Sequence, residues 1–284
     1  EIKECDWSSD VCSSDLALQA ITVHNDTGHL SYLLGDLHKG GWGGFYVLAL
    51  GVKTRWPLLF GGLAGWGMLV LRAGRERQWS ALEVPLMAVG ILFFASDYSH
   101  INIGVRHVLV IYPLLAIGAG VCAGALWRRA LDMGGARWLA GALLALGALS
   151  SGWTLVRTWP DYLAYFSPFA PNPEHVLVDS DLDWGQDFKR LKIRLAQLKV
   201  PSVSLAYLGT ADLNRESLPA YRLLNNPEQP VTGWVAVSAL ARAYAPGHLA
   251  WLRAYPVRER IGQTIDLYYI PPTATGPVSA AAPK

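Results

Sequence analysis

The sequence predicts an α-helical integral membrane region of about four spans, followed by a C-terminal α/β domain outside the cytoplasm. Charged residues make up only 16% of the 284 residues, whereas soluble domains carry about 25%. These charges are scarce between about residues 40 and 156 and ordinary afterwards. The uneven distribution indicates a membrane part and then a water-soluble part. The net charge of +2 is too small to indicate a nucleic-acid partner.

Residues 1–16 are set aside before the elements are considered. They lack the basic start and the apolar centre of a signal peptide. The stretch Asp6 to Leu16 can instead be encoded by the end of a common short-read sequencing adapter, so we interpret the segment as sequence-assembly read-through. We therefore expect the chain to be a fragment cut at its N-terminal side. Outside this segment the cysteine is Cys122, in an apolar run, which supports no disulfide or metal framework.

Four apolar segments are predicted to be membrane helices, over residues 56–71, 80–96, 107–127 and 138–156. A span needs about 20 apolar residues, and the last two segments contain no Lys, Arg, Asp or Glu. Ahead of them, residues 17–55 are predicted to form an outer loop. The apolar run 40–52 in this loop is too short for a span and indicates an interfacial or re-entrant helix.

The arginines of the short loops predict the orientation of these spans. Loops 72–79 and 128–137 carry three arginines each, whereas loop 97–106 carries one. Positively charged loops stay in the cytoplasm. We therefore expect both Arg-rich loops to lie inside, and residues 17–55, loop 97–106 and everything after residue 157 to lie outside.

The rest of the chain is predicted to pass through an aromatic and proline-rich linker, residues 158–174, into an α/β domain over residues 175–270. Its predicted strands are HVLVDS (175–180), SVSLAYLG (202–209), GWVAVS (233–238) and IDLYYI (265–270). Asp183 with Gln186 predicts a helix start. Apolar residues then recur at helical spacing, namely Trp184, Phe188, Leu191, Leu195 and Leu198. The order strand, helix, strand implies a parallel, right-handed unit. Residues 271–284 are predicted to be a disordered, low-complexity tail.

Arg106 and His107 are candidate ligands of a lipid phosphate, because by this topology they stand at the outer surface where the third span begins. An arginine forks onto phosphate oxygens and keeps its charge, and the histidine adds a donor. The alternative is a plain interfacial anchor, which the residues alone favour because ionisable residues at span ends are common.

A second group of candidates lies in the first outer segment: His29, Tyr32, Asp36 and Lys53. Its two histidines, His24 and His29, are five residues apart and do not share a helix face as a zinc pair would. Tyr32 is more typical of an interfacial aromatic than of a sugar platform.

A third group lies in the predicted outer domain. Asp179, Asp181 and Asp183 alternate in VDSDLDWGQD, and Thr210 and Asp212 stand in GTAD after the next strand. Ligands of open parallel sheets bind beyond the carboxyl ends of the strands, so we expect these side chains at one rim. Calcium-loop spacing is not met, and the need for a divalent metal stays open. Helix capping and dipole complementarity are the favoured alternative.

Four stretches together resemble a known family. GHLSYLLGD, GVKT, SHINIGVRHVLVIYP and VDSDLDWGQDFKRL…YLGTAD are similar to the C-terminal half of bacterial family-39-type glycosyltransferases, from about residue 24 to about residue 270 and in the family's order. These are polytopic GT-C enzymes that use polyprenyl-phosphate sugars and resemble protein O-mannosyltransferases. The resemblance implies transfer of a sugar from a polyprenyl-phosphate donor to an acceptor at the outer face of the bacterial inner membrane.

Within this resemblance Arg106, with His107 and Lys53, would neutralise the carrier phosphate, which is the leaving group. A cation placed there in advance lowers the barrier. Two departures from the family matter. The family's catalytic carboxylate lies in an outer loop after a first span that this chain lacks, so no catalytic residue is assigned and we expect an incomplete enzyme. The family also tends to have Lys-Thr-Pro where this chain has Lys53-Thr54-Arg55, which leaves the role of Lys53 open.

Two other functions are consistent with the residues. The chain could be a membrane-tethered α/β module that binds a ligand without catalysis. It could also be part of a transporter, but transporters favour polar or broken spans, and segments 107–127 and 138–156 carry no charged residue. The sugar and its acceptor, whether glycan, lipid or protein, stay open.

Overall fold

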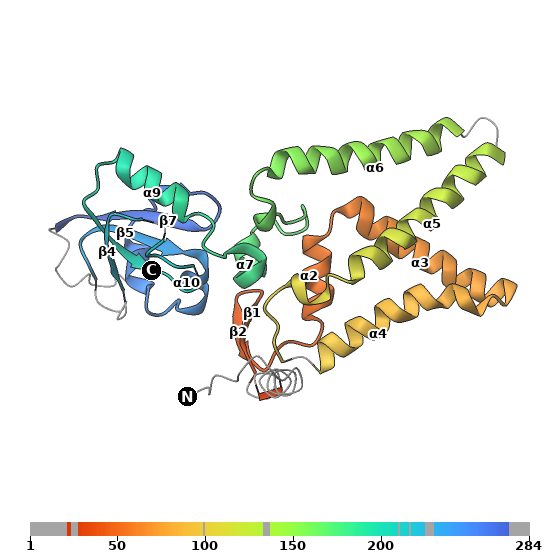
Figure 1. Cartoon of the computed structure of the whole chain (residues 1–284), viewed down its shortest axis with the longest axis horizontal. Coiled ribbons are helices and arrows are strands. Elements are labelled where there is room, and N and C mark those ends of the chain that lie inside the picture. The colour runs from red at the N-terminus through yellow and green to blue at the C-terminus, as the bar shows by residue number, and fades with distance from the viewer. Residues whose placement is uncertain are drawn as a thin grey trace, which may run out of the picture. The chain divides into compact units, whose positions relative to one another are not determined.

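The computed structural model describes residues 22–23, 28–98, 100–132, 137–209, 211–215, 217–224 and 230–272. The chain divides into two compact units after Pro171, and each is described by itself (Figure 1). The predictions for residues 1–16, for Thr210 and for the tail from residue 273 lie outside the described residues.

Four long helices make up most of the first unit. They are α3 (Trp56–Glu76), α4 (Glu83–Asp97), α5 (Ile111–Asp132) and α6 (Arg137–Thr158). Within the described residues these four are long and apolar enough to cross a membrane, when the 3-10 helix η1 (Trp79–Leu82) is counted with α4. The predicted number and order of apolar helices is thereby confirmed, and each helix includes or overlaps its predicted run.

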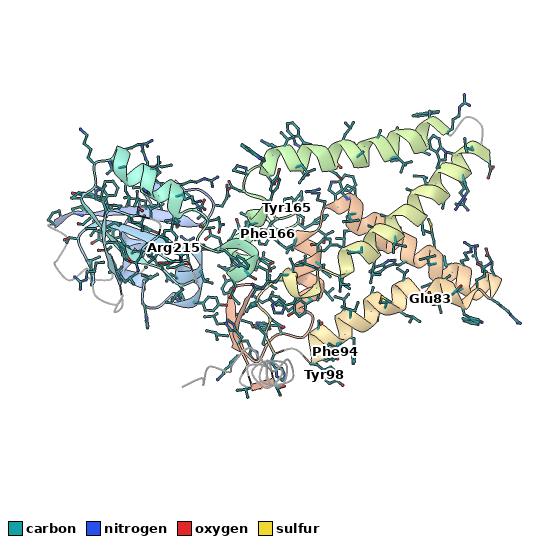
Figure 2. The ribbon with its side chains drawn as sticks, viewed as in Figure 1. Glu83, Phe94, Tyr98, Tyr165, Phe166 and Arg215 are labelled. Atoms are coloured by element: carbon teal, nitrogen blue, oxygen red, sulfur yellow. The ribbon has the colours of Figure 1, made fainter. Side chains whose placement is uncertain are left out.

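Many apolar side chains on these helices are exposed on the surface of the unit. Phe94 on α4, 65% exposed, stacks on Tyr98 with ring centroids 5.2 Å apart (Figure 2). Leu149 and Val156 on α6 are each more than 70% exposed. Contiguous apolar surface of this extent marks a membrane or partner surface rather than a water-facing one.

Helices α3 and α5 run in the same direction and pack backbone to backbone (Figure 1). The close approach depends on glycines: a Cβ atom on Gly65 would lie 1.7 Å from the carbonyl oxygen of Gly118, and one on Gly62 would lie 2.8 Å from that of Leu115. Nearby, the indole nitrogen of Trp66 donates to the carbonyl of Leu114 over 2.9 Å. Small residues at helix contacts are typical of helix pairs packed in membranes.

Short elements gather at one end of the helical unit, which we call the loop-rich end. They are the antiparallel strands β1 (Leu30–Leu33) and β2 (Asp36–Lys39), helix α2 (Phe45–Lys53) and the 3-10 helices η2 (Val105–Val108) and η4 (Tyr162–Ala164). Helix α2 agrees with the short helix predicted within residues 40–52. Three hydrogen bonds join residues 29–46 to the loop after α4. They run from His29 N–H to His100 O (3.1 Å), from Tyr46 Oη to Ile101 O (2.9 Å) and from Asn102 Nδ2 to Trp42 O (3.1 Å).

The second unit is built on a five-stranded sheet in the order β4-β3-β5-β7-β6. Its strands are β3 (Ser202–Ala206), β4 (Ala220–Leu223), β5 (Gly233–Ser238), β6 (Glu259–Ile261) and β7 (Ile265–Ile270). Strands β4, β3 and β5 are parallel, whereas β7 runs antiparallel to β5 and to β6. The expected C-terminal α/β region is therefore present, with mixed rather than purely parallel pairing.

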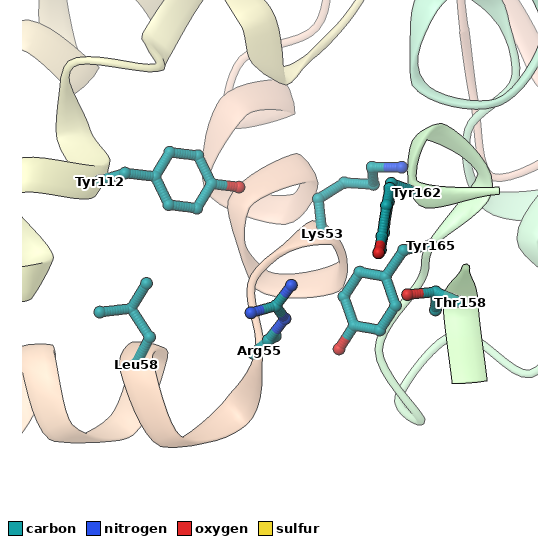
Figure 3. Close-up of a pocket in the computed structure, with 7 residues that line it drawn as sticks. All are labelled: Lys53, Arg55, Leu58, Tyr112, Thr158, Tyr162 and Tyr165. Atoms are coloured by element: carbon teal, nitrogen blue, oxygen red, sulfur yellow. The ribbon is translucent and has the colours of Figure 1, made fainter. Parts of the chain in front are cut away.

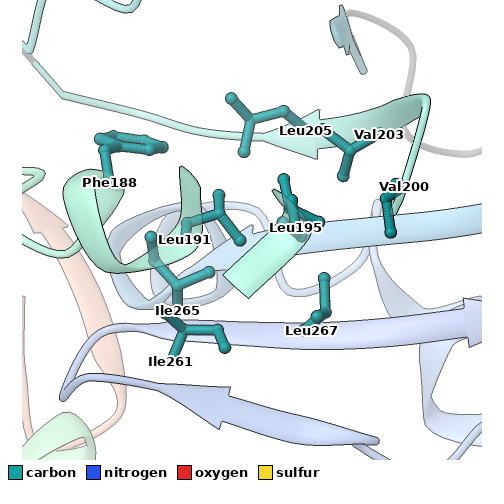
Figure 4. Packing of buried hydrophobic residues seen from close by; sticks show 10 residues of the cluster. Phe188, Leu191, Leu195, Val200, Val203, Leu205, Ile261, Ile265 and Leu267 are labelled. Carbon is teal, nitrogen blue, oxygen red and sulfur yellow. The ribbon is translucent and has the colours of Figure 1, made fainter. Parts of the chain in front are cut away.

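Two apolar clusters cover this sheet. One contains Phe188, Leu191 and Leu195 of helix α9 (Phe188–Gln197), packed on Leu205 and Leu267 (Figure 4). The other joins the helix α10 (Ala239–Tyr244) and the 3-10 helix η5 (Ala250–Ala254) to β5 and β7. The predicted apolar face of α9 is confirmed at Phe188, Leu191 and Leu195, each of which is completely buried.

Three local predictions in this unit were wrong. HVLVDS forms two single-turn helices, α7 (Pro173–Val176) and α8 (Asp179–Leu182), instead of a strand. Pro173 at the first helical position favours the first turn, and Asp179 has a φ of +25°, which no strand accommodates. The α9 N-cap is Asp187 instead of Asp183. Trp184 precedes the helix and is exposed.

Candidate functional site

A cationic pocket lies at the loop-rich end of the helical unit. It has a volume of about 320 Å³ and is lined by Lys53, Arg55, Leu58, Tyr112, Thr158, Tyr162 and Tyr165 (Figure 3). These residues come from the end of α2, the start of α3, the start of α5, the end of α6 and η4. Three segments that are far apart in the sequence thus meet where the apolar helices begin or end.

Arg55 is the N-cap residue of α3, and its guanidinium lies between the rings of Tyr112 and Tyr165 (Figure 3). Within the described part of the chain it makes no ion pair with a carboxylate. Burial raises the pKa of the Tyr165 phenol, while the charge of Arg55 acts to lower that pKa. The Tyr165 hydroxyl therefore stays protonated and available as a donor.

Lys53 contributes the second cation of this pocket. Its Nζ donates to the carbonyl of Leu163 over 2.7 Å and lies 4.3 Å from the ring centroid of Phe166. An ammonium has three N–H donors. The hydroxyl of Tyr112 accepts from Thr54 Oγ1 over 3.3 Å. The pocket thus offers two positive charges and several hydroxyls.

The chemistry of this lining suits an anion. None of the seven lining residues is a carboxylate or an imidazole, so the lining supplies charge and hydrogen-bond donors without a general base. Arginine and lysine beside tyrosine hydroxyls are the groups that bind phosphate oxygens in proteins.

The predicted pair Arg106 and His107 lies elsewhere at the same end. Both are exposed residues of η2, and neither belongs to the lining of the pocket. The ring of His107 stacks on Tyr46 of α2, with centroids 6.4 Å apart. Arg106 lies within the 3-10 turn, five residues before α5 begins at Ile111, whereas Arg55 directly precedes α3. Sequence reasoning therefore missed Arg55, although it stands before the charge-free run that begins at Trp56.

The other predicted residues of this end belong to the β1–β2 hairpin. Tyr32 is a buried β1 residue, and Asp36 is an exposed residue at the start of β2. His29 precedes β1, and its Nδ1 lies 2.7 Å from the carbonyl oxygen of Leu30. The structure thus places His29, Tyr32 and Asp36 in one hairpin and Lys53 in the pocket, with Lys53 the single predicted residue among the seven that line it.

In the second unit the predicted rim residues separate into different environments. Asp183 is buried, and its carboxylate accepts from the N–H groups of Gly185 (3.0 Å) and Leu240 (3.3 Å). Burial raises the pKa of Asp183, and these two bonds act in the opposite direction. Leu240 is the second residue of α10, so Asp183 satisfies one donor in the first turn of that helix, whose N-cap is Ser238.

The remaining rim carboxylates do not converge with Asp183 on a common ligand position. Asp179 Oδ2 accepts from the Tyr244 hydroxyl over 3.0 Å, and both burial and this carboxylate raise the Tyr244 pKa. Asp181 is buried, whereas Asp212 is half-exposed and pairs with Arg215 over 3.2 Å. Among the residues that the structure describes, no group of three His, Cys, Asp or Glu side chains could hold a metal ion.

A separate pocket of about 250 Å³ does lie beyond the carboxyl end of β3. Its lining includes Tyr207 and Leu208 after β3, Ala241 and Ala245 at α10, and His248. The chain leaves β3 toward β4 on one side and β5 toward β7 on the other. Such a divergence is where open α/β sheets bind ligands. The predicted rim carboxylates do not line this pocket, and a ligand at the rim stays a prediction.

Comparison of the chain with protein-family models, with curated proteins and with solved structures finds no match in any of the three.

Proposed function

We propose that the chain is part of an integral membrane glycosyltransferase that moves a sugar from a polyprenyl-phosphate carrier to an acceptor on the outer face of the membrane. In this proposal α3 to α6 span the bilayer, the loop-rich end faces outward, and the α/β unit is extracytoplasmic. The Arg-rich segments at the opposite helix ends support this orientation, because positively charged loops stay in the cytoplasm.

The observation that carries the proposal is the pocket of Lys53 and Arg55. A polyprenyl phosphate has an apolar chain that stays in the bilayer and an anionic head at its surface. The pocket matches the head, because it holds two cations at the end of apolar helices. Arg55 is partly buried and makes no ion pair with a carboxylate within the described residues, so an anionic ligand would have no carboxylate to displace there.

In the proposed reaction the bond between the sugar C1 and the phosphate oxygen breaks, and a bond from C1 to an acceptor oxygen forms. The acceptor loses a proton, and the phosphate leaves with an added negative charge. Arg55 and Lys53 would stabilise that growing charge, and preplaced cations do so without reorganisation at the moment of reaction. Arg106 and His107 stay predicted contributors at the surface, and the proposal assigns no general base to the described residues.

The test compares binding of a polyprenyl phosphate with binding of the matching polyprenol to the full chain in detergent. The phosphate form should bind at least about tenfold more tightly, which corresponds to one or two charge-assisted hydrogen bonds. Arg55→Gln should remove most of that difference. Arg157→Gln is the matched control, since Arg157 is an exposed residue near the end of α6 that lies 5.4 Å from the ring centroid of Trp153 and outside the pocket lining.

Equal affinity for the phosphate and the alcohol would overturn the proposal, as would an Arg55→Gln variant that keeps the preference. A second function is favoured by the pocket after β3, namely a membrane-tethered module that binds a ligand through Tyr207 and His248. The carrier-binding comparison separates the two, because a module that binds through the pocket after β3 would keep its ligand in the Arg55→Gln variant, since Arg55 does not line that pocket.

A further inference from the structure

A second groove lies between α3 and α5, toward the helix ends opposite the loop-rich end. It has a volume of about 490 Å³, and its walls include Leu69 of α3 and Ile117 and Val121 of α5. Gly120 and Gly124 line it as well. A Cβ atom on either glycine would have no neighbouring atom within 4 Å. The two glycines therefore leave an open apolar slot along α5.

Two arginines stand in the same lining, Arg72 of α3 and Arg128 of α5. Nε of Arg72 donates to Glu76 over 2.8 Å, and both side chains of this pair are about half exposed. The guanidinium has five N–H donors in all, so Arg72 keeps donors for a further anion. Arg128 is exposed and makes no ion pair within the described residues.

The position of these arginines matches the far surface of a bilayer. With a rise of roughly 1.5 Å per residue, Arg72 lies about 25 Å along α3 from the pocket end. The hydrocarbon core of a bilayer is about 30 Å thick. The groove is apolar along its length and cationic at this depth. It therefore matches an anionic phospholipid, whose acyl chain is apolar and whose phosphate is negatively charged.

We propose that this groove binds one anionic phospholipid of the leaflet that faces the Arg-rich segments. One acyl chain lies along Gly120 and Gly124, and the phosphate is bound by Arg72 and Arg128. Basic pockets between membrane helices on the cytoplasmic side are known binding places for anionic head groups. The inference rests on the membrane insertion proposed above and is independent of sugar transfer.

The occupant is a lipid rather than a neighbouring helix because of charge complementarity. Two guanidiniums line the groove and attract an anion, and Glu76, which is paired with Arg72, offsets only one of the two charges. A phosphate meets both guanidiniums while its acyl chain fills the apolar slot, so one molecule satisfies both parts of the groove.

The experiment places the full chain in nanodiscs of phosphatidylcholine with a minor fraction of phosphatidylglycerol and measures the co-purified lipids by native mass spectrometry. Wild type should retain phosphatidylglycerol in preference to phosphatidylcholine. Arg128→Gln should lower this retention about tenfold, the effect of losing a charge-assisted hydrogen bond. Arg129→Gln is the matched control, since Arg129 is an exposed neighbour on α5 that does not line the groove.

A second pair of variants tests the acyl slot. Gly124→Leu should fill the slot and release the bound lipid, whereas Gly90→Leu, on α4 and equally free of neighbours within 4 Å, should retain it. Equal losses in Arg128→Gln and Arg129→Gln would reduce the effect to general basic charge and overturn the proposal. A Gly124→Leu variant that keeps its lipid would equally overturn the proposal. A Gly124→Leu variant with a changed oligomeric mass would also overturn it, because the groove would then be filled by a helix of a second copy of the chain. Arg55→Gln should leave the retention unchanged, so this result and that of the carrier-binding test are separable.

Discussion

Replacing Asp187 by alanine is predicted to destabilise the α/β unit strongly. The carboxylate is completely buried. Its Oδ2 accepts from the N–H of Gln263 (2.7 Å), the N–H of Thr264 (3.0 Å) and the Thr264 hydroxyl (3.0 Å), while Oδ1 accepts from Arg190 (2.7 Å). Asp187 thus ties the start of α9 to the turn between β6 and β7.

The size of the effect follows from the donors that alanine would strand. A buried donor left without a partner costs about 1–3 kcal/mol. The two donors of Thr264 are buried and the N–H of Gln263 is partly buried, and all three would lose their partner. With partial relaxation we expect a loss of about 3–5 kcal/mol, against a total stability of about 5–15 kcal/mol for a domain. The turn itself is shaped to the carboxylate: Gly262 has a φ of +60°, and a Cβ atom there would lie 2.0 Å from Oδ1.

Hydrogen exchange measured by mass spectrometry on the full chain is the appropriate assay. The chain has two compact units, so a single melting temperature would mix their transitions. Peptides from β5 and β7 report opening of the α/β unit alone. Since about 1.4 kcal/mol corresponds to a factor of ten, exchange in the Asp187→Ala variant should accelerate between about a hundredfold and several thousandfold.

Asp212 provides the matched control, because it pairs with Arg215 at the same i,i+3 spacing as Asp187 with Arg190. Arg215 is 87% exposed (Figure 2), and exposed pairs contribute about 0–1 kcal/mol. Asp212→Ala should therefore barely alter exchange. If Asp187→Ala behaved like Asp212→Ala, the buried hydrogen bonds would not be what stabilises this turn, and the reasoning would fail.

Two further predictions concern packing and pH. Gly65→Ala should lower the thermal stability of the helical unit in detergent by an amount equivalent to roughly 3 kcal/mol or more, because its Cβ would meet the Gly118 carbonyl at 1.7 Å; Gly67→Ala, with nothing within 4 Å, should be neutral or slightly stabilising. Because burial raises the pKa of Asp183 above its ordinary value of 3.8, the folded state holds that proton to higher pH than the unfolded state. The contribution of Asp183 to the free energy of unfolding is fully present below that ordinary value and is lost as pH rises through the raised pKa. In urea titrations across the acidic range, the free energy of unfolding should therefore fall less with rising pH for Asp183→Asn than for the wild type.

The helical unit was predictable because its signal is compositional. A run such as Trp138–Val156 contains no charged residue over its whole length. An uncharged apolar run of this length predicts a membrane-spanning helix rather than a strand. The helices extend beyond the runs because terminal arginines can be helical while they reach toward water, as Arg75 does in the last turn of α3. Composition says where a helix is, but it does not say that Gly65 meets Gly118.

The α/β unit was predicted less well where a short apolar run fits both the period of a strand and that of a helix. Leu177 and Val178 are both buried, although the segment HVLVDS does not form the predicted strand. A run of six residues is too short for periodicity to separate a strand from a helical turn. The strands GWVAVS and IDLYYI succeeded because they lie in the middle of the sheet, where pairing on both sides enforces the extended form.

The candidate site shows a different limit. Arg55 and Arg106 are similar in the sequence, since each is an arginine just before an apolar run. They differ in the structure because Arg55 is the N-cap of α3, whereas Arg106 lies in a 3-10 turn that precedes α5. What makes Arg55 a site residue is the arrival of Tyr112 and Tyr165 beside it (Figure 3), from positions more than fifty residues away in the chain. A charge at a helix end is a local property, but the surroundings that turn it into an anion site are set by how helices pack.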